Sequence, residues 1–329
     1  MFMPKVLHIG PCDSPGGMAN VMRILGEHPP EGWDAELLAS HVVGSPWAKW
    51  RAYRKARSTL IRTLKDPTQR PDVVHLHTAA DWSWWRKRRF ALLAYRAGSK
   101  VVVHIHSGKF DSWLKASDSK RATSYVHFME KLEAKTVVLS HEWKVRLNRM
   151  IGSTHVIHNP IPNELRGDVQ LRDTHHLLLM GRNDPVKGHE FAVQVAKGLV
   201  NEFPNLKLTM TGVRQSNQTW IDARGWVNEN EKTKLLQTAS ILLVPSAFEG
   251  QPLVVLESLA CGLPVMTSDQ VLTGALPVEK IRYQDIQAWQ NAIRRAFNSP
   301  NKDPVLLEES VVEYRIKEVS KEWLNLYTS

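Results

Sequence analysis

Segment 245–265 combines the residues of an anion-binding helix start with two carboxylates. An apolar run ends where the segment begins, a polar loop containing Glu249 follows, and Pro252 suits the first turn of a new helix. Backbone N–H groups at the start of a helix bind anions well, especially after a glycine. Glu249 precedes this start, and Glu257 is expected one to two turns inside the helix. Carboxylates repel phosphate, so here they suit the hydroxyls of a sugar or ribose attached to that phosphate.

This pair of carboxylates has two alternative roles. Glu249 would favour a helix start through the helix dipole, and Glu257 could be a surface residue. The apolar neighbours of Glu257 weaken its assignment to the surface. A glycosidase acid/base pair is the second alternative, but its carboxylates must face each other across the scissile bond. The spacing therefore favours binding of a phosphorylated sugar.

The elements that must position these residues follow an α/β pattern, because short apolar runs alternate with longer helical patterns throughout the chain. Strands are expected at 5–9, 35–39, 72–77, 100–105, 136–139, 155–157, 176–180, 206–211, 240–244 and 264–267. Helices of the first half are expected at 18–27, 47–65, 84–97, 119–134 and 141–150. A proline-containing polar segment at 159–174 is expected to link two doubly wound domains, with a cleft between the carboxyl ends of their sheets.

Four segments in this order resemble the retaining GT-B glycosyltransferases of family 4. They are Pro15–Met18, Gly181–Gly188, Gly225–Val227 and Glu249–Val265, in which the two glutamates lie eight positions apart. The resemblance spans nearly the whole chain and is strongest over 176–268. It implies a GT-B fold of two Rossmann-like parallel-sheet domains facing across a cleft. The implied parts are an acceptor-binding domain at 1–165, a donor-binding domain at 166–305, and a C-terminal helix at 306–329 that packs back toward the first domain.

The same resemblance implies roles for individual residues. Arg182 and Lys187 would flank the diphosphate of a nucleotide sugar, Glu257 would bind the ribose, and Glu249 would bind the transferred sugar. His106, followed by Ser107-Gly108, resembles the active-site histidine of the first domain, with His104 as the alternative. The implied catalytic residues are His106, Arg182, Lys187 and Glu249. The implied donor-binding residues are Gly16, Gly17, Gly181, Arg182, Lys187, Trp226, Val227, Glu249, Gly250, Gln251, Pro252, Leu253 and Glu257.

No metal and no other cofactor is expected. Arg182 and Lys187 would supply positive charge to a leaving phosphate, although without the glutamate motif they could equally be a solvated pair. The sequence has no clustered Asp-x-Asp that could hold a metal. A UDP-linked donor is favoured over a GDP-linked one, although the residues do not identify the base. By resemblance, the donor phosphate would help to deprotonate the acceptor, so no protein nucleophile is required.

Two His-x-His pairs, His75/His77 and His104/His106, end neighbouring expected strands. Alternation places each pair on one face of its strand, so all four side chains could reach the cleft, while a structural role in the core is the default for any single histidine. Such a pair also fits metal ligation, but the sequence shows no third and fourth ligand with cysteine or carboxylate spacing.

The positive charge of the chain is concentrated in its first half. The 329 residues have ordinary globular composition, but residues 1–168 carry a net charge of +11 and residues 169–329 a net charge of −1. Two clusters, 47–57 and 82–90, combine tryptophans with lysines and arginines, as surfaces that contact anionic membranes do. The alternative is that these tryptophans fill the core and the charges are solvated. Nucleic acid is a rival partner, but no nucleic-acid fold signature is present, and none is expected to bind.

The sequence has no apolar run of the roughly 20 residues that a membrane helix needs, and its start does not resemble a signal peptide. Cys12 and Cys261 are too few and too distant for a disulfide framework or a zinc site. We therefore expect a cytoplasmic protein, peripheral on the inner face of the cell membrane. The expected activity is transfer of a sugar to a saccharide or lipid-linked acceptor in surface polysaccharide assembly. Within the family that the chain resembles, the capsule and exopolysaccharide branch is favoured. A GT-B sugar-nucleotide epimerase and a non-catalytic nucleic-acid-binding or lipid-binding module are the alternatives.

Overall fold

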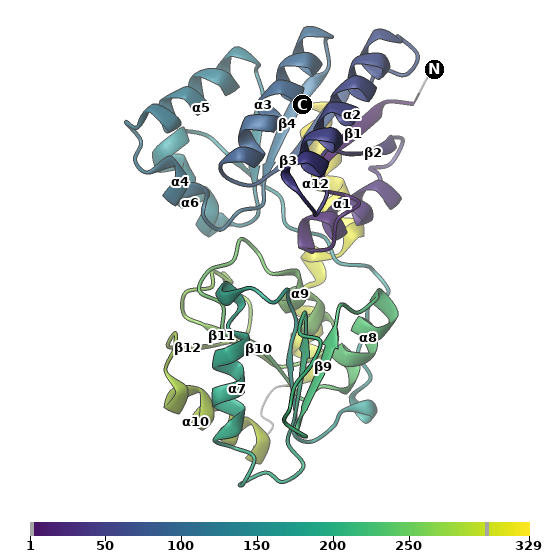
Figure 1. Ribbon diagram of the computed structural model, residues 1–329. Coiled ribbons are helices and arrows are strands. Elements are labelled where there is room, and N and C mark those ends of the chain that lie inside the picture. Colours follow the sequence, from purple (N-terminus) through teal and green to yellow (C-terminus); the bar gives the residue numbers. More distant parts are fainter. Residues whose placement is uncertain (1–2, 300–302) are drawn as a thin grey trace. The chain divides into compact units, whose positions relative to one another are not determined.

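The computed structural model describes residues 3–299 and 303–329, which form two compact α/β units (Figure 1). The first unit extends to Pro160 and includes Tyr314–Ser329, and the second comprises Ile161–Glu313. Each unit contains one six-stranded sheet in which every strand pairing is parallel. The doubly wound two-domain architecture expected from the sequence is confirmed.

The sheet of the first unit has the strand order β2-β1-β3-β4-β5-β6. Its strands are β1 (Lys5–Gly10), β2 (Asp34–Ala39), β3 (Val73–Thr78), β4 (Lys100–Ile105), β5 (Lys135–Val138) and β6 (His155–Val156). Its helices are α1 (Gly17–Glu27), α2 (Pro46–Lys65), α3 (Trp82–Arg96), α4 (Phe110–Leu114), α5 (Lys120–Lys131), α6 (His141–Ile151) and α12 (Ile316–Thr328). The apolar runs of β1, β3 and β4 are buried because helices cover both faces of an all-parallel sheet.

Serine caps start three of these helices. Ser45, Ser119 and Ser140 each accept a hydrogen bond from a backbone N–H three residues further on, at 3.1–3.2 Å. Such a cap satisfies one of the N–H groups that the first turn of a helix leaves without an intrahelical partner. Helices α2, α5 and α6 therefore begin where their local sequence predicts.

The sheet of the second unit has the strand order β12-β11-β10-β7-β8-β9. Its strands are β7 (His176–Leu179), β8 (Lys207–Thr211), β9 (Ile221–Gly225), β10 (Ile241–Val244), β11 (Val265–Ser268) and β12 (Glu279–Ile281). Its α-helices are α7 (His189–Lys197), α8 (Glu229–Thr238), α9 (Leu253–Ala260), α10 (Ile286–Asn298) and α11 (Pro304–Glu309). The short 3-10 helices are η1 (Val169–Leu171), η2 (Pro185–Lys187) and η3 (Val312–Tyr314). Leu177, Leu208 and Leu243 of three central strands pack with Trp289 of α10 in one apolar core.

Each sheet has one point at which the direction of strand addition reverses. In the first unit this point lies between β1 and β3, and in the second between β7 and β10. The loops that leave the carboxyl ends of the two strands diverge there, so doubly wound sheets bind their ligands at this place.

The C-terminal helix α12 belongs to the first unit, where Figure 1 shows it in yellow among elements of the N-terminal half. The Tyr327 hydroxyl lies 2.7 Å from His75 Nδ1, and the Trp323 ring lies 4.5 Å from the His75 ring. Helix α11, by contrast, contacts α9 of the second unit. The chain therefore returns to the first unit at Tyr314.

Candidate functional site

Two loops of the second unit meet where the strand order reverses. One follows β7 and contains Gly181–Gly188, and the other follows β10 and leads to α9. The Ala247 N–H donates to the Val186 carbonyl at 2.9 Å, which joins the two loops. Gly188 has a φ of +75°, and a Cβ there would lie 2.9 Å from the Pro245 carbonyl oxygen. Glycine at this position therefore allows the close contact between the loops.

The contact between the loops brings Lys187 and Glu249 together. Lys187 Nζ donates to Glu249 Oε1 at 2.5 Å, and the Ser246 hydroxyl donates to the same oxygen at 2.9 Å. Both side chains are mostly buried, with 23% and 14% of their surface exposed. The sequence predicts a separate ligand contact for each residue and does not predict their pairing. In this structure the lysine charge is compensated by the carboxylate.

Arg182 supplies an uncompensated positive charge in the same loop. Its side chain is exposed and has neither a hydrogen-bond nor an ion-pair partner among residues 3–299 and 303–329. Gly181 precedes it and donates its N–H to the Thr211 hydroxyl at 2.9 Å. This bond fixes the start of the loop against the end of β8. Arg182 is therefore available to an anionic ligand.

Helix α9 begins beside this ion pair. It starts at Leu253, after the half-buried Gly250 and Gln251 and the buried Pro252, and it has no side-chain cap and no acidic residue in its first turn. A helix start of this kind has a positive dipole end and N–H groups without intrahelical acceptors. The helix start expected after Pro252 is thus present.

Glu257 lies inside α9 and is buried, with 3% of its surface exposed. Its Oε1 accepts a hydrogen bond from Lys232 Nζ of α8 at 2.8 Å, and Lys232 also pairs with Glu229 at 2.6 Å. Burial lowers the pKa of Lys232, but the two carboxylates outweigh it and raise the pKa above its usual value. The interpretation of Glu257 as a surface residue is therefore wrong. The sequence indicates a charged helix after Val227 but does not single out Lys232 within it.

Trp226 and Val227 follow the edge strand β9. They leave the sheet at its carboxyl edge, as the loops after β7 and β10 do. Gly225 ends this strand with a φ of +63°, which favours glycine, and the Trp226 ring is 58% exposed. Asn228 and Glu231 form a capping box that starts α8 directly after Val227, which is half-buried. The exposed ring is thereby held between two fixed elements, and its face is open to stacking.

The glycine loop of the first unit follows β1. Gly16 has a φ of +129°, which L side chains rarely adopt, and the space where its Cβ would lie is open. Helix α1 begins at Gly17 without a side-chain cap and without an acidic residue in its first turn. The structure thus places Gly16 and Gly17 at a second open helix start, in a different unit from the other expected donor-binding residues.

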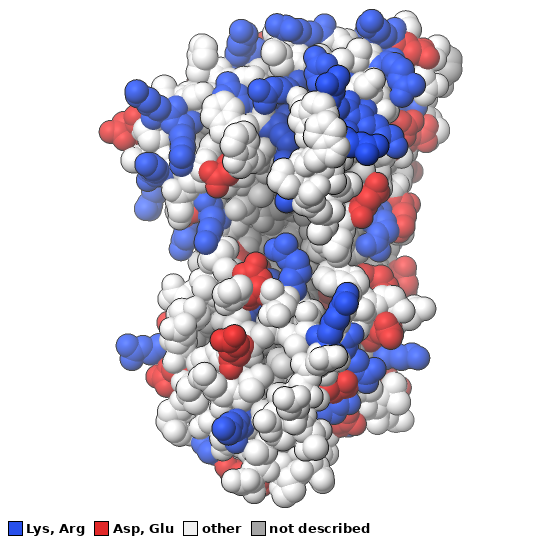
Figure 2. All heavy atoms as spheres, in the orientation of Figure 1, with Lys and Arg blue, Asp and Glu red and all other residues white. Residues whose placement is uncertain are grey.

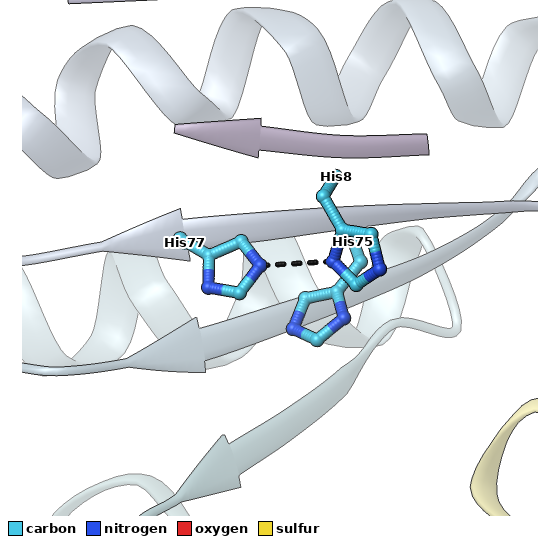
Figure 3. A group of neighbouring side chains, drawn as sticks. All are labelled: His8, His75 and His77. Atoms are coloured by element: carbon cyan, nitrogen blue, oxygen red, sulfur yellow. Dashed lines mark hydrogen bonds between the residues drawn. The ribbon is translucent and has the colours of Figure 1, made fainter. Parts of the chain in front are cut away.

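Five histidines lie together on one face of the first sheet. Strand register puts His8 beside His75 and His77 beside His104, and His106 follows β4 directly. Figure 3 shows His8 Nδ1 directed at His77 Nε2, 3.0 Å away, with His75 against them. A hydrogen bond of 2.9 Å joins His77 Nδ1 to His106 Nε2. A continuous chain of imidazoles therefore runs from the strand end into the core.

His106 is the member of this chain that a ligand can reach. It is half-buried, and His77 occupies its Nε2. Its Nδ1 has no hydrogen-bond partner within the described part of the chain. Burial lowers the pKa of His106 to about 3, so the ring is neutral at physiological pH. It can donate or accept one hydrogen bond through Nδ1, but it does not supply positive charge.

The other three histidines of the two pairs have the structural role that is the default for a single histidine. His75, His77 and His104 are completely buried, because α12 covers their face of the sheet, so they do not reach a cleft. The sequence shows no further ligand with cysteine or carboxylate spacing, and the groups that the fold brings together consist of histidines alone. Two trios that share His77, one with His8 and His75 and the other with His104 and His106, have possible ligand atoms within 4.8 Å of one another.

Most tryptophans of the two basic clusters are on the surface. Trp47, Trp50, Trp82 and Trp85 are 44–79% exposed, whereas Trp84 is buried. The Trp47 and Trp50 rings stack at 4.6 Å. Lys87 of the second cluster is also buried, so the cluster is not uniformly a solvated face.

Comparison with known proteins adds a family match to this geometry. Residues 174–299 match the model of the family "Glycosyl transferases group 1". The chain is 24% identical to glycogen synthase of Mycobacterium tuberculosis over 265 residues, which are 71% of this chain and 62% of the relative. It is 23% identical over 279 residues to the UDP-Gal:alpha-D-GlcNAc-diphosphoundecaprenol alpha-1,3-galactosyltransferase of Escherichia coli, covering 73% of this chain and 70% of that protein. The chain thus spans less than two thirds of the mycobacterial relative.

Among solved structures, sucrose-phosphate synthase from Thermosynechococcus elongatus superimposes with a TM-score of 0.76 at 17% identity. The match covers 99% of this chain and 98% of that one. This likeness concerns the fold, and it confirms the GT-B fold expected from the sequence. All the expected donor-site residues of the second unit lie inside the segment that matches the family.

Proposed function

We propose that this chain is a retaining glycosyltransferase that moves a sugar from a nucleotide diphosphate sugar to an acceptor. The observation that carries the proposal is the pairing of Lys187 with Glu249 beside the open start of α9, where the strand order of the second unit reverses. This is where a doubly wound sheet binds a nucleotide. The match of residues 174–299 to a glycosyltransferase family supports the same activity.

The donor would bind along the carboxyl edge of the second sheet. Arg182 and the N–H groups of α9 would contact the diphosphate, and Lys187 would add charge where the leaving phosphate becomes more negative. The exposed Trp226 ring would stack on the base, and the Glu257 carboxylate would accept hydrogen bonds from the ribose hydroxyls. A UDP-linked donor is supported by the name of the Escherichia coli relative.

Glu249 would hold the transferred sugar. Its carboxylate is fixed by Lys187 and Ser246, and a fixed acceptor can orient a sugar hydroxyl at little entropic cost. In the first unit, neutral His106 would hydrogen-bond a sugar hydroxyl through Nδ1, with His77 setting its tautomer. The donor phosphate would take the acceptor proton on the same face of the sugar, so the anomeric configuration is kept without a protein nucleophile.

Charge compensation by the protein would make the reaction independent of a metal. Arg182, Lys187 and the positive end of α9 would supply the electrostatic stabilisation that a divalent cation provides in metal-dependent enzymes. The two histidine trios belong to the first unit, and His106 is a member of one of them.

The acceptor would be a saccharide, or a saccharide linked to a lipid at a membrane surface, in surface polysaccharide assembly. The name of the Escherichia coli relative specifies a lipid diphosphate acceptor, which supports this class. The face in Figure 2 shows lysines and arginines gathered over the first unit. Exposed tryptophans on α2 and α3 lie among them, as in proteins that rest on acidic lipid surfaces. No helix in the described part of the chain is long and apolar enough to span a bilayer.

Nucleotide release from a panel of nucleotide sugars, with and without a lipid extract, tests the proposal. A transferase releases nucleotide faster when the extract supplies an acceptor. An epimerase converts the nucleotide sugar without any acceptor, and a binding module leaves it intact. Either of the last two results would overturn the proposed activity.

A further inference from the structure

A lysine ammonium group is buried in the first unit without an acidic partner. Lys87 of α3 is 2% exposed, and its Nζ donates to the Ser40 hydroxyl at 2.6 Å. No carboxylate among residues 3–299 and 303–329 pairs with it. Burial lowers the pKa of Lys87 to about 7, and the neighbouring Arg86 adds to the effect. Buried charges are ordinarily paired, so this site lacks a counter-charge.

The chain neighbours of this hydrogen-bonded pair, His41 after Ser40 and Arg86 before Lys87, each have a ring or guanidinium nitrogen without a partner among the described residues. Nε of the half-buried Arg86 and Nδ1 of the half-buried His41 are enclosed within the protein, and neither has a hydrogen-bond partner in the described part of the chain. The pKa of His41 is lowered by burial and then by the positive charges of Arg86, Lys49 and Lys87. A buried polar group without a partner is unfavourable, and native proteins contain few of them.

These groups lie at the carboxyl edge of the first sheet. The Ser40 N–H, directly after β2, donates to the carbonyl of Gly10, the last residue of β1, at 2.8 Å. The Ser14 hydroxyl of the glycine loop donates to the His41 carbonyl at 3.4 Å. The glycine loop leads into α1, whose start has no side-chain cap and no acidic residue. The cations therefore lie at the carboxyl edge of the sheet, beside the loop after β1, which is one of the two strands at which the strand order reverses.

We propose that Arg86, His41 and Lys87 form a binding site in the first unit for a phosphate group of the acceptor. The Arg86 guanidinium and the His41 ring donate to the phosphate oxygens, and the Lys87 ammonium lies beneath them and supplies charge. An arginine fork matches phosphate geometry, and hydrogen bonds to a charged oxygen are stronger than those between neutral groups.

This inference rests on the proposed function, because it assigns the phosphate to the acceptor. The donor diphosphate is already assigned to the second unit, around Arg182 and Lys187. A phosphate site in the first unit then selects an acceptor that carries a phosphate ester, as a lipid-linked saccharide or a phosphorylated sugar does. The buried cations, rather than the exposed tryptophans, would provide this selection.

Inorganic phosphate is the probe for this site, and the full chain is titrated while UDP saturates its own binding. We expect phosphate to bind in the presence of UDP, and Arg86→Gln to weaken its affinity by about tenfold or more, as expected for losing one charge-assisted contact. Arg96→Gln is the matched control, because Arg96 is an exposed arginine of the same helix. Phosphate affinity that is equal in the two variants, or abolished by UDP, would overturn the proposal.

Kinetics with acceptors distinguishes the source of the phosphate. If the proposal holds, Arg86→Gln raises the KM for a phosphate-bearing acceptor more than the KM for the same saccharide without phosphate, and Arg96→Gln changes neither. Equal effects on both acceptors would contradict it. If phosphate binding depends on Arg86 but the chain transfers no sugar, the phosphate site is supported and the proposed function is contradicted. If the chain transfers sugar but Arg86→Gln does not change phosphate binding, the proposed function is supported and the phosphate site is contradicted.

Discussion

The Lys187 ammonium and the Glu249 carboxylate form one ion pair across two loops of the second unit, with Nζ and Oε1 2.5 Å apart. The pair joins the loop after β7 to the loop after β10, where the strand order reverses. Neither side chain is therefore independent of the other. A ligand that draws Lys187 toward a phosphate changes the surroundings of the carboxylate proposed to hold the sugar.

Replacement of the lysine tests its contribution to the leaving diphosphate. Lys187→Ala is expected to lower turnover of the nucleotide sugar by about 10²–10³, the usual effect of removing one electrostatic donor from a reaction site. Lys197→Ala, at an exposed position on α7, serves as the matched control and should retain wild-type turnover. Initial rates of nucleotide release measure both. Wild-type turnover in Lys187→Ala would remove the lysine from the site.

Replacement of the glutamate separates sugar binding from nucleotide binding. Glu249→Gln keeps a side-chain oxygen for the hydrogen bonds from Lys187 and Ser246 but removes the charge. We expect sugar transfer to fall while the affinity for UDP is retained, because the proposed partner of Glu249 is the sugar. Calorimetry with UDP and transfer rates provide the two readouts. A loss of UDP affinity with unchanged transfer would assign Glu249 a different role.

Chelation tests the role of the protein's own positive charge. Because Arg182, Lys187 and the start of α9 would neutralise the diphosphate, a chelator should leave the rate of transfer unchanged. The measurement is the rate after extensive treatment with chelator, compared with the rate after adding back magnesium, manganese or zinc. Activity that disappears on chelation and returns with one of these ions would contradict this phosphate site.

The buried histidines should make the first unit sensitive to acid. Burial lowers the pKa of His8 from 6.5 to about 3, so between these values the unfolded chain binds a proton that the folded chain does not. The free energy of unfolding should therefore fall as the pH decreases through this window, with a slope of up to about 1.4 kcal/mol per pH unit for each such histidine. Denaturant unfolding at several pH values measures the slope, and His8→Asn should reduce it. A slope that is the same in this variant would show that His8 does not cause the acid sensitivity.

Contact with acidic lipid should depend on the exposed tryptophans of α2. Trp47 is 63% and Trp50 44% exposed, and the Arg54 guanidinium lies 4.9 Å above the Trp50 ring. Each basic residue near an anionic leaflet contributes about 1 kcal/mol. The double variant Trp47→Ser/Trp50→Ser should bind acidic vesicles less than the wild type does, and Leu306→Ser, an exposed apolar position in the second unit, should not. Equal binding to neutral and acidic vesicles would leave these clusters as solvated faces.

The sequence predicted the elements whose signal is local. The buried strands read as apolar runs, and the serine caps of α2, α5 and α6 start these helices where their patterns begin. Strands β9 and β12 were missed because they are short edge strands with charged residues, Ile-Asp-Ala-Arg-Gly and Glu-Lys-Ile. An edge strand is covered on fewer sides, so its side chains need no continuous apolar run.

Partners that lie far apart in the sequence could not be predicted. Lys187 and Glu249 are 62 positions apart, and they meet because Gly188 lets one loop pass close to Pro245. Glu257 and Lys232 meet because α9 and α8 follow strands of the same sheet. The burial of Lys87 likewise depends on how α3 packs against the end of β2. The sequence did not indicate it, because Lys87 stands in a run of basic residues. The local elements were thus easier to predict than the contacts between residues that lie far apart in the sequence.

The fate of a labelled sugar tests the proposed transfer most directly. A nucleotide sugar with carbon-13 in its sugar is incubated with the full chain and a lipid extract, and the new glycosidic bond is examined by NMR. A retaining glycosyltransferase should move the label from the nucleotide to the acceptor and keep the anomeric configuration of the donor. Label that stays on the nucleotide, or that reaches the acceptor with inverted configuration, would contradict the proposed function.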